Sequence, residues 1–254
     1  MGKYDTKAVI QHILEETGHQ KIVYVGHSQG AGQMLCALWD NEDWYADKLS
    51  LFIAWAPATK LSQIDTQILR RLSKNKTVNI IEDNSNFPVY MKPNRFLINS
   101  WCLILKAIPA LAKLETRRFK GLRPDINDLT GSQIHWYSHP NGTSMKALRH
   151  WRQIIKDNRF QLYDYHDKNQ EIYGSNIPPL IDISKIQKVP IAIMYGKHDI
   201  LVTSEDVEWV ISQLQPNILK FHKQYDYNHS TFLCGYDMSY VDDIHKLVEK
   251  YCFN

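Results

Sequence analysis

The 254-residue sequence is poor in several features that would assign it to a special class of protein. Its net charge of +3 is small and scattered, so no nucleic-acid partner is predicted. The four cysteines lie far apart, without a C-x-x-C pair or histidines at metal-ligand spacing, and we expect no metal or other cofactor. The first residues lack the apolar core of a signal peptide. What remains, 44% hydrophobic and 22% charged residues, is typical of a globular protein.

The most informative motif is Gly26-His27-Ser28-Gln29-Gly30. An apolar stretch typical of a strand ends just before it, and a helical pattern starts just after it. A G-x-S-x-G motif in this context is typical of a nucleophile elbow. The sharp turn crowds the flanks of the serine, which favours the small residues Gly26 and Gly30 two positions on either side. Ser28 is therefore the predicted nucleophile.

Hydrophobic periodicity predicts an α/β fold interrupted by a long insertion. In the first helix we expect Val9, Ile10, Ile13 and Leu14 to share one face, and Gly18 to end the helix. Between residues 60 and 188 strand–helix alternation is lost, so we predict a core of residues 1–59 and 189–254 around an inserted, mainly helical domain of residues 60–188. The predicted core elements are helix 5–16, strand 21–25, helix 31–39, strands 51–55 and 189–195, helix 204–214, strand 219–224 and helix 239–251.

A nucleophilic serine needs a base, and the base needs an orienting acid. Asp199 follows a predicted buried strand, whereas its rival Asp206 lies in the next helix, where we expect an exposed first turn. His229 follows the last strand and is the predicted base. The other histidines near these elements lie beside the acid, within a strand or within a helix: His198, His222 and His245.

Further residues along the chain resemble those of one protein family. They are Lys3-Tyr4-Asp5, Tyr24-Val25 before the elbow, Ala54 with Ala56-Pro57, Ser138-His139-Pro140, Gly142-Thr143-Ser144, His150-Trp151 with Gln153, Phe160 with Tyr163-Asp164, Val189-Pro190-Ile191-Ala192, Gly196 with Asp199, and Tyr227-Asn228-His229 with Phe232. With them the chain resembles the acid lipases, the gastric and lysosomal members of the α/β-hydrolase superfamily. The resemblance implies a lipid ester hydrolase acting on triacylglycerols or sterol esters, secreted or lysosomal, with the insertion as cap and lid. It places the triad on Ser28, Asp199 and His229.

Relative to that family, the sequence corresponds to the C-terminal two-thirds only. The N-terminal part would carry the signal peptide, the first strands and a His-Gly loop with the second oxyanion donor, which leaves the backbone N–H of Gln29 as the first donor. We expect strand 21–25 to become a bare apolar edge, open to a partner, and the chain alone to fold poorly or react slowly. The alternatives are an inactive hydrolase-like scaffold or interaction protein, or hydrolysis of peptides or thioesters.

The insertion contains a dense apolar run over residues 96–114. Lys106 and Pro109 exclude a membrane span. The run predicts either a buried cap helix or a lid at a lipid–water interface, in which Trp101 and Leu105 would meet acyl chains. Three N-x-[ST] sequons allow a glycoprotein in a secretory compartment, although one of them abuts the predicted base and is interpreted as coincidence: Asn75, Asn141 and Asn228.

Overall fold

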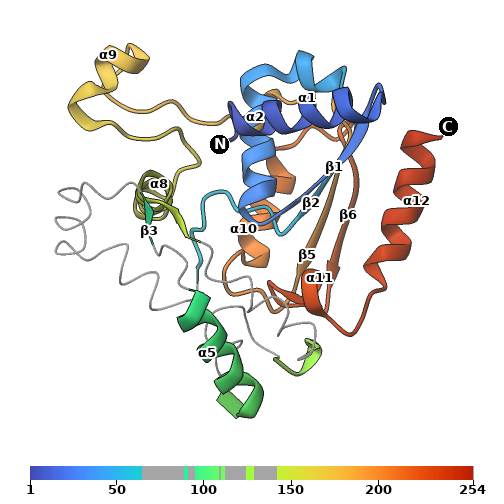
Figure 1. The fold of residues 1–254 in the computed structure, drawn as a ribbon. Coiled ribbons are helices and arrows are strands. Elements are labelled where there is room, and N and C mark those ends of the chain that lie inside the picture. Colours follow the sequence, from blue (N-terminus) through green and yellow to red (C-terminus); the bar gives the residue numbers. More distant parts are fainter. Residues whose placement is uncertain (65–88, 91–94, 109, 112–123, 129–141, 254) are drawn as a thin grey trace.

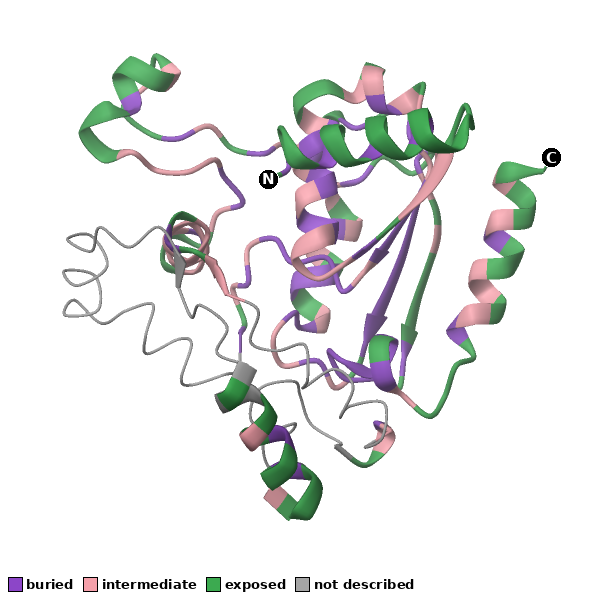
Figure 2. Ribbon diagram, viewed as in Figure 1, coloured by how far each residue is buried: buried purple, intermediate pink, exposed green. Residues whose placement is uncertain are grey.

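A parallel sheet of four strands in the order β1-β2-β5-β6 forms the centre of the computed structural model (Figure 1). The strands are β1 (Ile22–His27), β2 (Leu49–Trp55), β5 (Ile191–Gly196) and β6 (Leu219–Tyr225). The structure describes residues 1–64, 89–90, 95–108, 110–111, 124–128 and 142–253. The inner strands β2 and β5 are buried along almost their whole length, as their continuous apolar sequences predict, and the outer strands are partly exposed (Figure 2).

Alternate residues of the inner strands supply two separate hydrophobic cores, one on each face of the sheet. Phe52 and Ile193 point to the face covered by α2 (Gln29–Ala46) and α10 (Ser204–Gln213). The other face carries Leu51, Ile53, Ala192 and Met194, which pack with residues of α11 (Thr231–Cys234) and α12 (Tyr240–Cys252). Figure 1 shows α12 on the opposite side of the sheet from α2, and α1 (Asp5–Thr17) over α2. These layers confirm the predicted α/β class.

All eight predicted core elements are found, with their ends moved by a few residues, and α2 extends furthest beyond its predicted end. Gly18 ends α1 in the left-handed conformation, with φ 70°. The predicted buried face of α1 is partly wrong, because Val9 and Ile13 are 56% and 38% exposed. Because α1 packs on the outside of α2, only a narrow stripe of α1 is buried. This stripe consists of Thr6, Ile10 and Leu14, which follow one another at intervals of about one helical turn.

The chain between β2 and β5 has a different organisation from the sheet. Its described elements are β3 (Val89–Tyr90), α5 (Arg95–Ala107), the 3₁₀ turn η1 (Pro124–Ile126), β4 (Thr143–Ser144), α8 (Met145–Asp157), η2 (His166–Lys168), α9 (Asn169–Tyr173) and η3 (Ile183–Lys185). The two short strands form an antiparallel pair of their own. Neither of these two strands joins the parallel sheet, and the predicted inserted domain of residues 60–188 stays a prediction.

Two carboxylates hold the ends of this long segment against the core. Asp206, expected to be exposed, is 1% exposed and accepts hydrogen bonds from the backbone N–H groups of Ser62 and Gln63 at 3.0 and 3.4 Å. It lies in the first turn of α10, as predicted, but the chain leaving β2 covers that turn. At the other end, Glu42 accepts from the three successive N–H groups of residues 187–189. The segment thus leaves and rejoins the core at fixed points.

Several predicted surface features can be compared with the described residues. Within these ranges no helix is long and apolar enough to cross a membrane, and His, Cys, Asp and Glu side chains form no group that could hold a metal ion. The four cysteines are free thiols. Asn228 is fully buried, which makes its sequon inaccessible in the folded protein, whereas Asn75 and Asn141 lie outside the described residues.

Candidate active site

Ser28 occupies a sharp turn between β1 and α2. Its φ of 56° and ψ of −115° lie outside the regions that a serine normally adopts, a strained geometry that persists only where the surroundings hold it. Its N–H donates to the carbonyl of Trp55 at 2.8 Å, and its carbonyl accepts from the N–H of Ala58 at 3.2 Å. The end of β2 and the loop after it therefore fix the turn from both sides.

Crowding around the elbow accounts for the glycine at position 26 but not for the glycine at position 30. A Cβ on Gly26 would lie 2.7 Å from the backbone nitrogen of Ala31, so this position admits only glycine without a shift of the helix. A Cβ on Gly30 would meet nothing nearer than the Tyr24 hydroxyl, at 3.9 Å. The crowded position on the helix is Gly32, where a Cβ would lie 2.1 Å from the carbonyl oxygen of Ala58. The expectation that Gly30 relieves crowding is thus wrong, and Gly32 fulfils that requirement.

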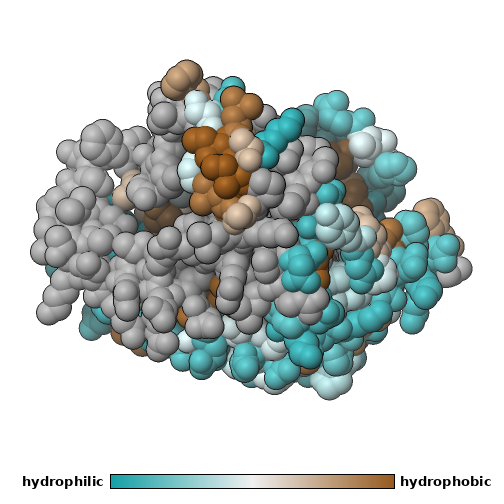
Figure 3. Space-filling view, turned by 90° about the horizontal axis from the view of Figure 1, so that it is seen from below, coloured by the Kyte–Doolittle hydropathy of each residue, from teal (hydrophilic) through white to brown (hydrophobic). Residues whose placement is uncertain are grey.

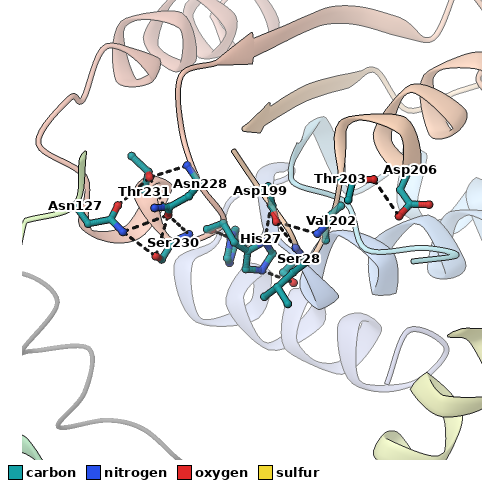
Figure 4. A network of polar contacts seen from close by, with 12 residues as sticks. His27, Ser28, Asn127, Asp199, Val202, Thr203, Asp206, Asn228, Ser230 and Thr231 are labelled. Carbon is teal, nitrogen blue, oxygen red and sulfur yellow. Dashed lines mark hydrogen bonds and ion pairs between the residues drawn. The ribbon is translucent and has the colours of Figure 1, made fainter. Parts of the chain in front are cut away.

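Ser28, His229 and Asp199 come together at the carboxyl ends of β1, β6 and β5. Figure 4 shows Ser28 and Asp199 at this place. His229 Nε2 lies 3.0 Å from Ser28 Oγ, and His229 Nδ1 lies 2.6 Å from Asp199 Oδ2. The Asp199 side chain is fully buried, and its Oδ1 accepts from the N–H groups of Leu201 and Val202 at 2.8 and 2.9 Å. With Oδ1 so occupied, Oδ2 faces the imidazole, and the tautomer that fits carries its proton on Nδ1 and offers Nε2 to the serine hydroxyl.

His27 is a site residue whose contacts sequence reasoning missed. Its Nε2 lies 2.8 Å from the backbone carbonyl of His229, and the two imidazole rings lie 4.7 Å apart at an angle of 42°. A carbonyl can only accept, so His27 carries a proton on Nε2. Burial, and after it the proximity of His229, lowers the pKa of His27 from 6.5 to about 4. His27 is therefore a neutral hydrogen-bond donor at moderate pH.

Gln29 is the first residue of α2 and directly follows Ser28. The N–H groups in the first turn of a helix have no acceptor within the helix, and they bear the positive end of its dipole. The backbone N–H of Gln29 is therefore suited to an oxygen that becomes negative beside Ser28. Its side chain does not take part in the triad and lies against the sulfur of Met1, at 3.2 Å from Nε2.

Trp101 and Leu105 lie one turn apart on α5, which is found on the side of the molecule toward which β5 and β6 point (Figure 1). Trp101 is 45% exposed, whereas Leu105 is 1% exposed. The two side chains are neighbours along one side of the helix, with Trp101 at its exposed edge and Leu105 in its covered part. Leu105 and Cys102 form the covered part of α5, and the contact of Trp101 and Leu105 with acyl chains stays a prediction.

Known proteins resemble the chain over nearly all its length. Mouse gastric triacylglycerol lipase is 31% identical over 241 residues, covering 93% of this chain and 60% of the relative. Human lipase member K is 29% identical over 260 residues, with coverages of 100% and 64%. The chain thus spans less than two-thirds of the length of these relatives. No protein-family model matches it.

Solved structures show the same fold at low sequence identity. A soluble variant of monoglyceride lipase from Saccharomyces cerevisiae matches with a TM-score of 0.52 and 18% identity, covering 98% of this chain and 69% of the other. A monoacylglycerol lipase of Paleococcus ferrophilus matches with a TM-score of 0.50 and 14% identity, with coverages of 96% and 72%. The chain is therefore similar to acid lipases, as a homologue of part of gastric lipase and lipase K, and has the α/β-hydrolase fold.

Proposed function

We propose that the chain carries the catalytic centre of a serine hydrolase that cleaves lipid esters through an acyl-enzyme. The observation that carries the proposal is the continuous hydrogen-bonded series from Ser28 through His229 to Asp199, with separations of 3.0 and 2.6 Å. In this proposal residues 1–59 and 189–254 form the catalytic core, and residues 60–188 form a cap that supplies substrate contacts.

The proposed reaction uses the two hydrogen bonds of His229. His229 Nε2 takes the proton of Ser28 Oγ as that oxygen attacks the ester carbonyl, and then gives it to the departing alcohol oxygen. Asp199 keeps the imidazole in the productive tautomer and stabilises its cationic form. Water then attacks the acyl-enzyme, with His229 again as base, to release the fatty acid and restore Ser28.

The negative oxygen of the tetrahedral intermediate would be stabilised by the backbone N–H of Gln29. An N–H held by the start of a helix is already oriented, so it needs no rearrangement as charge develops. Loss of one such donor typically costs about 10²–10³ in kcat. Because a backbone donor cannot be removed by a side-chain change, this contribution depends on the position of the whole turn, which Trp55 and Ala58 hold through backbone hydrogen bonds.

A lipid substrate is supported by the names of the relatives and by the surface of α5. The relatives include gastric triacylglycerol lipase. Figure 3 views the molecule from the side on which α5 lies and shows a hydrophobic patch there. The exposed apolar residues of this helix and its continuation are Phe96, Trp101, Leu103, Ile104 and Ile108. Such a surface fits the acyl chains of a substrate or a lipid–water interface.

The test is labelling of the purified protein with a fluorophosphonate, which reacts with an activated serine. We expect labelling that is abolished in Ser28→Ala, and hydrolysis of long-chain glycerol or sterol esters in preference to peptides and thioesters. Equal labelling of the wild type and Ser28→Ala would contradict the proposed nucleophile. Labelling with a preference for peptides or thioesters would retain the serine but contradict the lipid substrate.

We further propose that the protein enters the secretory or lysosomal route. The available sequons would then be Asn75 and Asn141, because Asn228 is buried. Treatment of the protein from its native source with an N-glycosidase should increase its mobility on a denaturing gel. An unchanged mobility, together with a cytosolic distribution on fractionation, would contradict this location.

A further inference from the structure

The loop that bears His229 is built from buried polar residues. Asn228, Ser230 and Thr231 are 0%, 3% and 0% exposed. Within the loop, the N–H of Asn228 donates to Thr231 Oγ1 at 3.0 Å, and Asn228 Oδ1 accepts from the N–H of Ser230 at 3.1 Å. Buried polar groups of this kind need partners, because water cannot replace a lost hydrogen bond there.

Asn127, about a hundred residues earlier in the chain, enters this loop from the segment after η1 (Figure 4). It is 2% exposed. Its Nδ2 donates to Asn228 Oδ1 and to Ser230 Oγ, both at 3.2 Å, and its Oδ1 accepts from Thr231 Oγ1 at 2.8 Å. One amide side chain therefore binds the residues on both sides of His229.

Backbone contacts hold Asn127 in register with the same loop. Asn127 forms an isolated antiparallel bridge with Gly235. The N–H of Asp128 donates to the carbonyl of Cys234 at 2.7 Å, and the N–H of Tyr236 donates to the carbonyl of Ile126 at 3.2 Å. The segment around η1 thus lies against α11, which directly follows the histidine loop.

We infer that Asn127 is a positioning residue that sets the place of the His229 imidazole. The inference rests on the proposed function of Ser28 and His229. Both ring nitrogens of His229 have close partners, at 3.0 and 2.6 Å, so a small displacement of its backbone lengthens one bond or the other. The segment between β2 and β5 would thereby contribute to the proton transfer itself, as well as to substrate contacts.

The test compares Asn127→Ala with Asn169→Ala. Asn169 is a matched control, because it lies in the same long segment and is 1% exposed, and its side-chain hydrogen bonds within the described ranges go to its own surroundings at Asp164, Tyr165 and Asn176. Both changes remove a buried amide and should lower the melting temperature. We expect Asn127→Ala alone to reduce kcat, by roughly 10- to 100-fold for a misplaced base, with little change in KM. Thr231→Val should act in the same direction, and Thr231→Ser, which keeps the hydroxyl, should restore kcat.

A second readout is independent of activity. A proton held between His229 Nδ1 and Asp199 gives a separate low-field signal in the proton NMR spectrum. We expect Asn127→Ala to shift or broaden this signal and Asn169→Ala to leave it unchanged. Equal effects of the two variants on kcat and on this signal, or an effect of Asn127→Ala on KM alone, would overturn the inference. Failure of the proposed function would instead appear as an inactive wild type, and the NMR comparison would still decide the position of His229.

Discussion

At the scale of single residues, the lowered pKa of His27 makes the stability of the protein depend on pH. The pKa is about 4 in the folded protein and 6.5 for the free side chain. As the pH falls from 6.5 to 4, the unfolded chain takes up a proton that the folded protein does not, which favours unfolding. This difference corresponds to roughly 3 kcal/mol at most, since one pKa unit is worth about 1.4 kcal/mol.

We therefore expect His27→Gln, which keeps an N–H donor but does not titrate, to lose less stability than the wild type between pH 7.5 and pH 4.5. Urea unfolding at the two pH values measures the difference. His222→Gln is the matched control, because His222 is exposed on β6. If His27→Gln and the wild type lost the same unfolding free energy over this range, the assigned pKa of His27 would be wrong.

The two helix glycines after Ser28 allow a second comparison at this scale. Gly30→Ala places its Cβ 3.9 Å from the nearest atom, so we expect normal esterase activity and a gain of up to about 1 kcal/mol in helix stability. Gly32→Ala places its Cβ 2.1 Å from the Ala58 carbonyl, which also belongs to the loop that holds the elbow. It should lose activity and a few kcal/mol of stability, typically about 1–3 for an overpacked site. Similar melting temperatures and rates in both variants would contradict this account.

The residues that could be predicted from the sequence are those whose signal is local. Ser28, Asp199 and His229 each follow a strand, and parallel strands bring their carboxyl ends to one edge, so the sequence pattern alone predicts that these three side chains lie close together. Asn127 and Asp206 could not be predicted, because their partners lie about 100 to 144 residues away and no spacing reports such a contact.

At the scale of elements, the helical and strand patterns were reliable, but the faces of the peripheral helices were not. Helices α1 and α5 have more apolar residues than the neighbouring elements can cover, so some of these residues stay exposed. Periodicity shows which residues are able to be buried, whereas the width of the contact decides which of them are. This is why Ile13 is exposed beside the buried Leu14, and Ile104 beside the buried Leu105.

The different exposure of Trp101 and Leu105 on α5 allows substrate contacts and stability to be tested separately. Trp101→Ser changes a side chain that is 45% exposed, so we expect an unchanged melting temperature. The rate of hydrolysis should fall roughly tenfold, which corresponds to about 1.4 kcal/mol, for long-chain esters only. Leu105→Ser removes a buried side chain, which should cost about 2–5 kcal/mol of stability and reduce hydrolysis of short and long esters alike. Rates on butyrate and oleate esters, with thermal unfolding, measure both effects. A loss on both esters in Trp101→Ser would remove the proposed substrate surface.

At the scale of the whole molecule, the sheet has an apolar strand at one edge. In the described structure β1 pairs with β2 on one side, and its residues Ile22, Val23 and Tyr24 are half-buried while Val25 is 43% exposed. The strand at the opposite edge, β6, contains several charged and polar residues, among them Lys220, His222 and Lys223. An edge strand with few charges is a template for pairing with another chain, and lysine is the residue that most often prevents it.

We therefore expect the 254-residue chain, expressed by itself, to associate with increasing concentration through β1. Val25→Lys should shift the sedimentation profile toward the monomer, because a charge on the edge strand must be desolvated when a second strand approaches. Val9→Lys supplies the matched control, since Val9 is 56% exposed on α1 and adds the same charge away from the sheet. If both lysines reduced association equally, net charge would be the cause. If only Val25→Lys reduced association, the edge of β1 would be the contact. A segment or partner that pairs with β1 would then also stabilise the turn at Ser28, because Ser28 directly follows β1 in the chain.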